Sequence, residues 1–248
     1  MKIVIFLAAV VVALTGCTSR DYDAMPVYLL LGQSNMVGMR SMTADLPAEL
    51  QKTQHHALFF KDGKWVELAP GVSEPKGFGP EISFSDEMAK SGETIGLIKI
   101  SAGATTLFSE WNPKSKDLLY TKTINAVDAA RKTRPIKIAG ILWMQGESDG
   151  ATLEMAEAYS RNLKLMISSF RADLQSAEIP VAVCRVTAPT NQFPHIDMVR
   201  KAQQLETAEH YKWFDCDSLT KGPDNLHYDT HGQIKLGYKF AEAIKSIR

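Results

Sequence analysis

Short apolar runs alternate with longer amphipathic stretches along the chain from residue 26 onward. The apolar runs have the length of buried strands, and the amphipathic stretches carry apolar residues at helical spacing. The expected strands are residues 27–31, 94–100, 136–144, 179–186 and 212–216, and the expected helices are residues 80–90, 118–132, 152–174, 196–208 and 233–247. A small hairpin is predicted in addition at residues 57–60 and 65–68, around an Asp-Gly turn.

Strands that alternate with helices indicate a parallel sheet covered by helices on both faces. We therefore predict an α/β fold, a three-layer α/β/α sandwich with a sheet of about five strands. A chain of 248 residues suits one domain of this kind, and no repeat or linker divides it, so residues 26–248 are expected to form a single domain. Thr230 followed by Gln233 matches a capping box for the start of the last helix.

Residues 1–17 have the pattern of a targeting segment. Lys2 precedes an apolar stretch over residues 3–14, which is short for a membrane span and has the length of a secretory signal. The segment ends Leu-Thr-Gly-Cys, which resembles the lipobox of bacterial lipoproteins, where the cysteine, here Cys17, is diacylated and becomes the mature N-terminus. A plain cleaved signal or an uncleaved anchor is the alternative. With lipidation, residues 18–25 form a tether in the bacterial cell envelope, and Thr18 favours the outer membrane.

Charge and cysteine content limit the partners and the redox chemistry. The chain has 28 lysines and arginines against 28 aspartates and glutamates, and it lacks the basic stripe that nucleic-acid binding requires. An oxidising envelope would permit a disulfide between Cys184 and Cys216. Both cysteines lie in or beside apolar stretches, however, so we favour buried free thiols.

The first strand ends in a small polar turn that carries one serine, Ser34. Parallel sheets have their reactive groups at the carboxyl ends of strands, so Ser34 is a candidate nucleophile. Turns of this composition also end strands that have no catalytic role. Near the C-terminus, Asp224 and His227 stand three residues apart before the last helix, where His227 can act as general base and Asp224 can orient it.

Two neighbours compete for these roles. His231 is a rival base, but it falls in the first turn of the last helix and is expected to be exposed. Asp229 is a rival acid, but it suits the start of that helix, where the helix dipole favours a carboxylate. We therefore favour His227 and Asp224.

An acyl-transfer site also needs hydrogen-bond donors for the oxyanion of the transition state. The candidates are the backbone N–H groups of Ser34 and Gly103 and the side-chain amide of Gln145. Gly103 follows the second long strand and Gln145 the third, so both are expected at the same edge of the sheet as Ser34. The missing side chain of Gly103 would let a substrate approach the backbone.

These segments resemble the SGNH/GDSL hydrolase superfamily, and within it the carbohydrate esterase 6-like and sialate O-acetylesterase-like (SASA domain) branch. The marks of that branch are Gly-Gln-Ser-Asn-Met at residues 32–36, Gln-Gly-Glu-Ser at residues 145–148 and Asp-x-x-His at residues 224–227. Residues 79–84 also look like that branch. The resemblance covers about residues 26–240, nearly the whole mature chain.

The resemblance implies a flavodoxin-like sandwich, no metal or other cofactor, and hydrolysis of acetyl esters on sugars. It carries the nucleophile role to Ser34, the base role to His227 and oxyanion roles to Gly103 and Gln145. Acetylated xylan, O-acetylated sialic acid and other acetylated glycans all stay open as substrates.

We also expect Gln33, Glu147 and Trp111 to contact the substrate. Trp111 could equally cover the core instead of stacking on a sugar ring. Glu147 and Asp149 could form the carboxylate pair of a glycosidase, but such a pair must flank the scissile bond at a defined separation. We interpret Glu147 as a hydrogen-bond partner that shapes the site.

Two other functions compete with carbohydrate acetylesterase activity. The first is a lipolytic or thioester-cleaving SGNH enzyme that prefers longer acyl chains. The second is a glycan-binding lipoprotein without turnover, against which the combination of Ser34, Asp224 and His227 argues.

Overall fold

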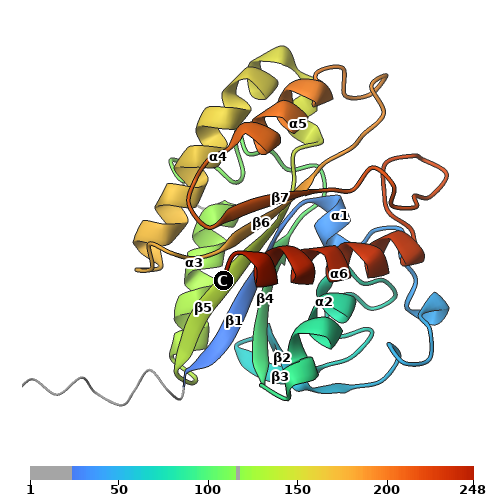
Figure 1. The fold of residues 1–248 in the computed structure, drawn as a ribbon, viewed down its shortest axis with the longest axis vertical. Helices are drawn as coiled ribbons and strands as arrows, with labels where there is room; N and C mark the ends of the chain where they lie inside the picture. The colour runs from blue at the N-terminus through green and yellow to red at the C-terminus, as the bar shows by residue number, and fades with distance from the viewer. Residues whose placement is uncertain (1–23, 116–117) are drawn as a thin grey trace, which may run out of the picture.

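The computed structural model describes residues 24–115 and 118–248. They form a seven-stranded sheet in the order β3-β2-β4-β1-β5-β6-β7, with helices on both faces (Figure 1). Neighbouring strands run parallel, except that β3 is antiparallel to β2. The strands are β1 Met25–Gly32, β2 Gln54–Lys61, β3 Lys64–Leu68, β4 Ile95–Ser101, β5 Ile136–Met144, β6 Val181–Arg185 and β7 Tyr211–Asp215.

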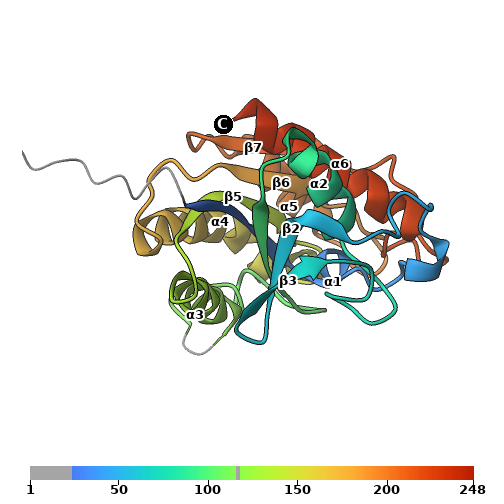
Figure 2. The same ribbon diagram turned by 90° about the horizontal axis from the view of Figure 1, so that it is seen from below.

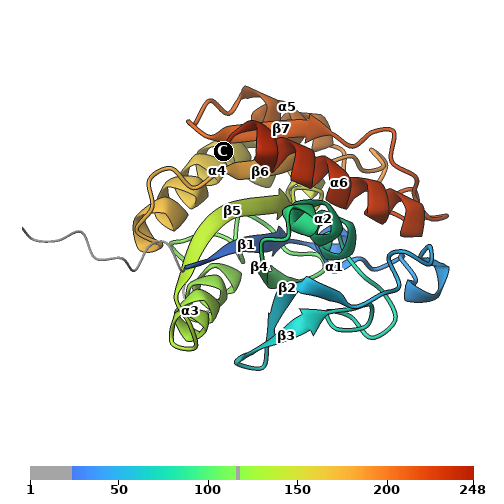
Figure 3. The same cartoon turned by 60° about the horizontal axis from the view of Figure 1, so that its bottom comes forward.

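Helices cover the sheet in two layers. Their bounds are α1 Ser34–Val37, α2 Glu81–Met88, α3 Leu119–Arg131, α4 Leu153–Asp173, α5 Ile196–Leu205 and α6 Thr230–Ser246, with short 3-10 turns at Thr43–Asp45, Ala89–Ser91 and Ser148–Ala151. One face of the sheet carries α2 and α6, which pack side by side, and the other carries α3, α4 and α5 (Figures 2 and 3). The predicted α/β/α sandwich is therefore confirmed.

Close packing of α2 against α6 depends on a glycine. A Cβ placed on Gly237 of α6 would lie 2.1 Å from the Ser83 hydroxyl oxygen and 2.4 Å from the Pro80 carbonyl oxygen. Any larger side chain would push the two helices apart. This contact fixes the position of α6, whose first turn follows the predicted acid and base.

The sheet is wider than the sequence indicated, since it has seven strands instead of about five. The predicted hairpin is present as β2 and β3, with the turn at Asp62 and Gly63. It is part of the main sheet, because β2 pairs in parallel with β4 through residues 57–59. The hairpin therefore extends the sheet beyond β4 and leaves β3 at the edge.

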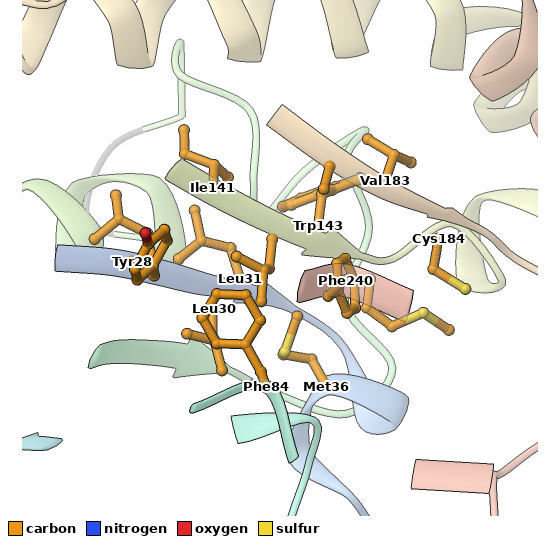
Figure 4. Close-up of a cluster of buried hydrophobic side chains, with 14 of the residues drawn as sticks. Tyr28, Leu30, Leu31, Met36, Phe84, Ile141, Trp143, Val183, Cys184 and Phe240 are labelled. Atoms are coloured by element: carbon orange, nitrogen blue, oxygen red, sulfur yellow. The ribbon is translucent and has the colours of Figure 1, made fainter. Parts of the chain in front are cut away.

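The core lies on both sides of β1, the central strand, which is buried along almost its whole length. Side chains of β1 meet Phe84 of α2 and Phe240 of α6 on one face, and Ile141 and Trp143 extend the cluster along β5 (Figure 4). Because the central strand is held from both faces, the residue that follows it has a fixed position.

Two local expectations are corrected. Cys184 of β6 and Cys216, which follows β7, form a disulfide, so the expectation of free thiols is wrong. Adjacent strands explain the pairing, since Cys184 stands opposite Phe214 and the two cysteine Cα atoms are 6.3 Å apart. At the start of α6 the capping residue is Asp229, whose carboxylate accepts the Gly232 N–H at 2.8 Å, and Thr230 is the first helical residue.

The predicted lipidation site, Cys17, and most of the tether lie outside the described residues. Within residues 24–115 and 118–248, each helix is too short or too polar to span a bilayer.

Candidate active site

Three neighbouring strands end at the same level, which brings three predicted segments together. Gly32, the last residue of β1, pairs with Ser101 on β4 and with Met144 on β5. The residues that follow these strands carry Ser34, Gly103 and Gln145. The common edge therefore joins groups that are 42 to 111 residues apart in sequence.

Ser34 opens the one-turn helix α1 at this edge. The chain turns sharply before it, because Gly32 has φ +156° and a Cβ there would lie 2.0 Å from the Met144 carbonyl oxygen. Among the described residues no backbone carbonyl accepts a hydrogen bond from the N–H groups of Ser34 or Gly103. A Cβ placed on Gly103 would lie 3.9 Å from the Ser34 Cβ, so the two residues are close neighbours at this edge.

Asp224 and His227 form an acid–base pair in the loop before α6. His227 Nδ1 donates to Asp224 Oδ2 at 3.0 Å, which leaves Nε2 as the free ring nitrogen. The other carboxylate oxygen accepts the backbone N–H groups of Leu226 and His227, at 3.1 and 3.0 Å. Arg40 adds a hydrogen bond from Nε to Oδ2 at 3.0 Å.

This environment keeps Asp224 ionised. Partial burial by itself raises the pKa of the carboxyl, but hydrogen bonds from the His227 ring, the two backbone N–H groups and Arg40 outweigh it and hold the pKa well below its usual range. A permanently ionised carboxylate at Nδ1 fixes the imidazole tautomer that has its lone pair on Nε2.

Asn35, the neighbour of Ser34, attaches this pair to the nucleophile turn. Its Nδ2 donates to the Leu226 carbonyl at 3.2 Å, and its Oδ1 accepts the Tyr228 N–H at 3.0 Å. These are the two residues on either side of His227. Asn35 therefore attaches the loop that carries the base to the turn that carries the serine, although the two segments are more than 190 residues apart along the chain.

Glu147 supports Asn35 from the interior. Its Oε1 accepts a hydrogen bond from Asn35 Nδ2 at 2.8 Å, and the side chain has no exposed surface. Burial raises the pKa of Glu147 against the opposing effect of this hydrogen bond. The expectation that Glu147 contacts the substrate is wrong because the side chain is inaccessible, whereas the interpretation of Glu147 as a hydrogen-bond partner agrees with this contact.

Gln145 has a different environment from the one expected for an oxyanion donor. The residue has no exposed surface, and its Nε2 donates to Asp149 Oδ2 at 2.6 Å, to the Thr105 carbonyl at 3.0 Å and to Gln33 Oε1 at 3.2 Å. All hydrogens of the amide are used in the interior. The prediction for the Gln145 side chain is therefore corrected: it presents no free donor to a substrate.

The free amide nitrogen belongs to Gln33 instead. Its Oε1 accepts from Gln145 Nε2 at 3.2 Å, from the Gly146 N–H at 3.3 Å and from the Ser148 N–H at 3.4 Å. Its Nε2 donates to no group among the described residues, and it is absent from the fully buried unpartnered atoms there. The three donors hold the oxygen in the interior, so the nitrogen is the end of the amide that stays available to a ligand.

Trp111 belongs to the core. The side chain has no exposed surface, its ring packs edge-on against Trp143 at a centroid distance of 5.1 Å, and its Nε1 donates to Thr105 Oγ1. The prediction that it contacts a substrate is wrong, and its core alternative holds. Asp149 is also buried, so Glu147 and Asp149 cannot flank a glycosidic bond.

The two rival residues stand apart from the acid–base pair. Asp229 caps α6, as its position near the helix start predicted, and its Oδ1 also accepts from the Thr220 hydroxyl. His231 is exposed in the first turn of α6 and lines a surface hollow with Arg40 and Asp229.

Sequence reasoning missed two residues of the site, Asn35 and Arg40. Asn35 stands within the nucleophile motif, so its position beside Ser34 was a usable signal. Arg40 pairs with a residue 184 positions away, and only the path of the loop after α1 brings the two together.

Comparisons with known proteins identify the family of this chain. A family model described as "Carbohydrate esterase, sialic acid-specific acetylesterase" matches residues 24–246. A "probable carbohydrate esterase" of Arabidopsis thaliana is 29% identical over 241 residues, which cover 89% of this chain and 90% of the relative. A crystal structure of an Arabidopsis thaliana protein has a TM-score of 0.80 at 26% identity, over 90% of this chain and 98% of that one.

More distant structures share the fold. NanS has a TM-score of 0.69 at 16% identity, over 90% of this chain and 97% of its own. A carbohydrate acetylesterase of Xanthomonas citri has a TM-score of 0.68 at 18% identity, over 90% of this chain and 56% of its own. The family match spans nearly all described residues, and the chain is thus a carboxylic ester hydrolase that belongs to the carbohydrate esterase family of sialic acid-specific acetylesterases.

Proposed function

We propose that this protein removes O-acetyl groups from carbohydrate through a covalent acetyl-serine intermediate on Ser34. The observation that carries the proposal is the attachment of the Asp224–His227 pair to the Ser34 turn through Asn35. Family membership supports the acetyl ester of a sugar as the substrate class.

In the first half-reaction, Ser34 Oγ attacks the acetyl carbonyl carbon while His227 Nε2 takes the hydroxyl proton. The tetrahedral intermediate then collapses, the bond to the sugar oxygen breaks, and His227 returns the proton to that oxygen. In the second half-reaction, His227 takes a proton from water, the resulting hydroxide attacks the acetyl-serine carbonyl, and acetate leaves as Ser34 regains its proton.

The oxyanion of both tetrahedral intermediates would accept hydrogen bonds from the N–H groups of Ser34 and Gly103 and from Gln33 Nε2. Support for Gln33 comes from its amide, whose oxygen is held by three donors while its nitrogen is free. Each such donor typically contributes about 3 to 4 kcal/mol to transition-state stabilisation.

The experiment is acetate release from two glycans by the purified full-length protein and its Ser34→Ala variant. The family description supports O-acetylated sialic acid as one substrate, and acetylated xylan is the second. Release from either glycan that is lost in Ser34→Ala is the expected result, and the productive glycan identifies the substrate. Near wild-type turnover in Ser34→Ala would contradict the mechanism, and binding of the glycans without release would favour a non-catalytic role.

We also propose that Cys17 carries lipid and that the domain faces away from the membrane. Strand β1 starts at Met25, and its eight residues extend roughly 25 Å toward the site. A membrane-anchored tether at the start of β1 would therefore leave Ser34 open to soluble or polymeric glycans. Incorporation of labelled palmitate that disappears in Cys17→Ser is expected, and equal labelling of that variant would refute the anchor.

A further inference from the structure

Met39 lies beside Ser34 and Gly103 at the end of the central strands. It follows α1 and Gly38, and its backbone N–H donates to the Ser34 carbonyl at 3.3 Å. A Cβ placed on Gly103 would lie 3.1 Å from Met39 Cε, 3.6 Å from its Sδ and 3.9 Å from Ser34 Cβ. The thioether therefore lies beside Gly103 and Ser34, where under the proposed function the acyl group of an ester would lie.

The same side chain borders a larger apolar hollow. This hollow has a volume of about 450 Å³ and is lined by residues 37–39, 41–42 and 74–77. Met39 lines the hollow and touches Gly103, so it stands between the hollow and the acyl space. Met39 is 56% exposed, so burial in the core does not explain its position.

We propose that Met39 is a specificity-determining residue that closes the acyl site and restricts it to acetyl esters. This inference rests on the proposed function of Ser34. The methyl end of Met39 fills the place that the third and fourth carbons of a longer acyl chain would occupy. Without it, the acyl space would open into the hollow beside Val37 and Met42, where apolar side chains could receive those carbons.

The test is the hydrolysis of p-nitrophenyl acetate, propionate, butyrate and hexanoate by the full-length protein and its variants. In the wild type we expect kcat/KM to fall at least about tenfold from acetate to butyrate, the low end of discrimination by methylene groups. Met39→Ala should raise the butyrate-to-acetate ratio at least about tenfold, whereas Met39→Leu, of similar volume, should keep the wild-type ratio.

Met42→Ala is the matched control. Met42 also lines the hollow and is 47% exposed, but it is not among the atoms nearest to Gly103. The butyrate-to-acetate ratio of kcat/KM in Met42→Ala should equal that of the wild type. An unchanged ratio in Met39→Ala, an equal rise in Met42→Ala, or a wild type that prefers butyrate would overturn the proposal.

Ser34→Ala separates the role of Met39 from the role of the serine. If Ser34→Ala hydrolyses the four esters as fast as the wild type, the serine mechanism is wrong whatever Met39 does. If hydrolysis depends on Ser34 while truncation of Met39 leaves the ratio unchanged, only the role of Met39 is wrong. Met39→Ser provides a second truncation in case the alanine variant does not fold.

Discussion

The two polar atoms of the Gln33 amide have opposite environments. Three N–H groups hold its oxygen, and its nitrogen has no partner among the described residues. The sequence motifs identified both Gln33 and Gln145 as residues of the site. Which of them offers its amide depends on the buried acceptors around Gln145, namely Thr105 and Asp149, and these come from segments whose packing no local pattern reveals.

Substitution of Gln33 tests the donor role. Gln33→Ala should lower kcat about a hundred- to a thousandfold with a small change in KM, because the lost hydrogen bond acts on the transition state. Gln33→Glu keeps an oxygen for the three buried N–H groups and replaces the donor with an acceptor. It should be at least as inactive as the alanine variant in steady-state kinetics while it keeps the wild-type unfolding midpoint. Wild-type kcat in Gln33→Glu would show that the amide nitrogen is dispensable.

At the scale of elements, Asn35 connects α1 to the loop that precedes α6. Its carboxamide hydrogen-bonds on both sides of His227, and its backbone carbonyl accepts from Gln233 Nε2 of α6 at 2.8 Å. The alternation of apolar and polar residues predicted the strands and helices that bring these segments to one edge. It could not predict a single side chain that fixes the base.

Asn35→Ala should therefore lower kcat by up to about a hundredfold, since a small misplacement of a catalytic group has effects of this size. Glu147→Gln can still accept the Asn35 hydrogen bond and should lose much less activity. Stopped-flow or steady-state kinetics on an acetyl ester measures kcat for both variants. A drop in the free energy of unfolding of Asn35→Ala with unchanged kcat would mean that Asn35 only stabilises the fold.

Asp149 connects the segment after β5 to the segment that follows Gly103. Its oxygens accept the N–H groups of Leu107 and Phe108 at 2.9 and 3.0 Å. Burial is the largest influence and raises the pKa of Asp149 to about 6, although hydrogen bonds from Gln145, Leu107 and Phe108 act in the opposite direction. A raised pKa means that the folded protein binds this proton more tightly than the unfolded chain does.

The contribution of Asp149 to stability is therefore greatest at low pH and declines as the pH rises from about 4 to about 6. The shift corresponds to roughly 3 kcal/mol across that window. Glu147, whose pKa is also raised, acts in the same direction. The free energy of unfolding, measured with urea, should decline less between about pH 4 and about pH 7 for Asp149→Asn than for the wild type. Identical slopes would mean that Asp149 has an ordinary pKa.

At the scale of the molecule, the disulfide joins the last two strands of the parallel sheet. Cys184 and Cys216 are 32 residues apart, and a loop of this length corresponds to about 3 to 4 kcal/mol of stabilisation in the chain-entropy account. The double variant Cys184→Ala/Cys216→Ala should lose about that much free energy of unfolding. Reductant should destabilise the wild type similarly and leave the variant unchanged. A wild type insensitive to reductant would contradict a structural disulfide.

The pattern of apolar and polar residues was sufficient to predict the main architecture. Strands that are buried on both faces have continuous apolar sequences, and helices that are buried on one face have amphipathic ones. It failed where the outcome depends on contacts between distant segments. The hairpin extends the sheet because β2 reaches β4, and Trp111 is buried because Trp143 lies beneath its loop. The cysteines pair because β6 and β7 are neighbours, which the order of elements along the chain does not specify.

The most direct test of the central claim is to trap the acetyl group on the enzyme. The full-length protein would be mixed with the O-acetylated glycan that it deacetylates, quenched rapidly in acid, digested and analysed by mass spectrometry. The account predicts an acetyl group on the peptide that contains Ser34. Rapid acetate release by the wild type with no acetylated Ser34 peptide at any quench time, or with equal release by Ser34→Ala, would contradict it.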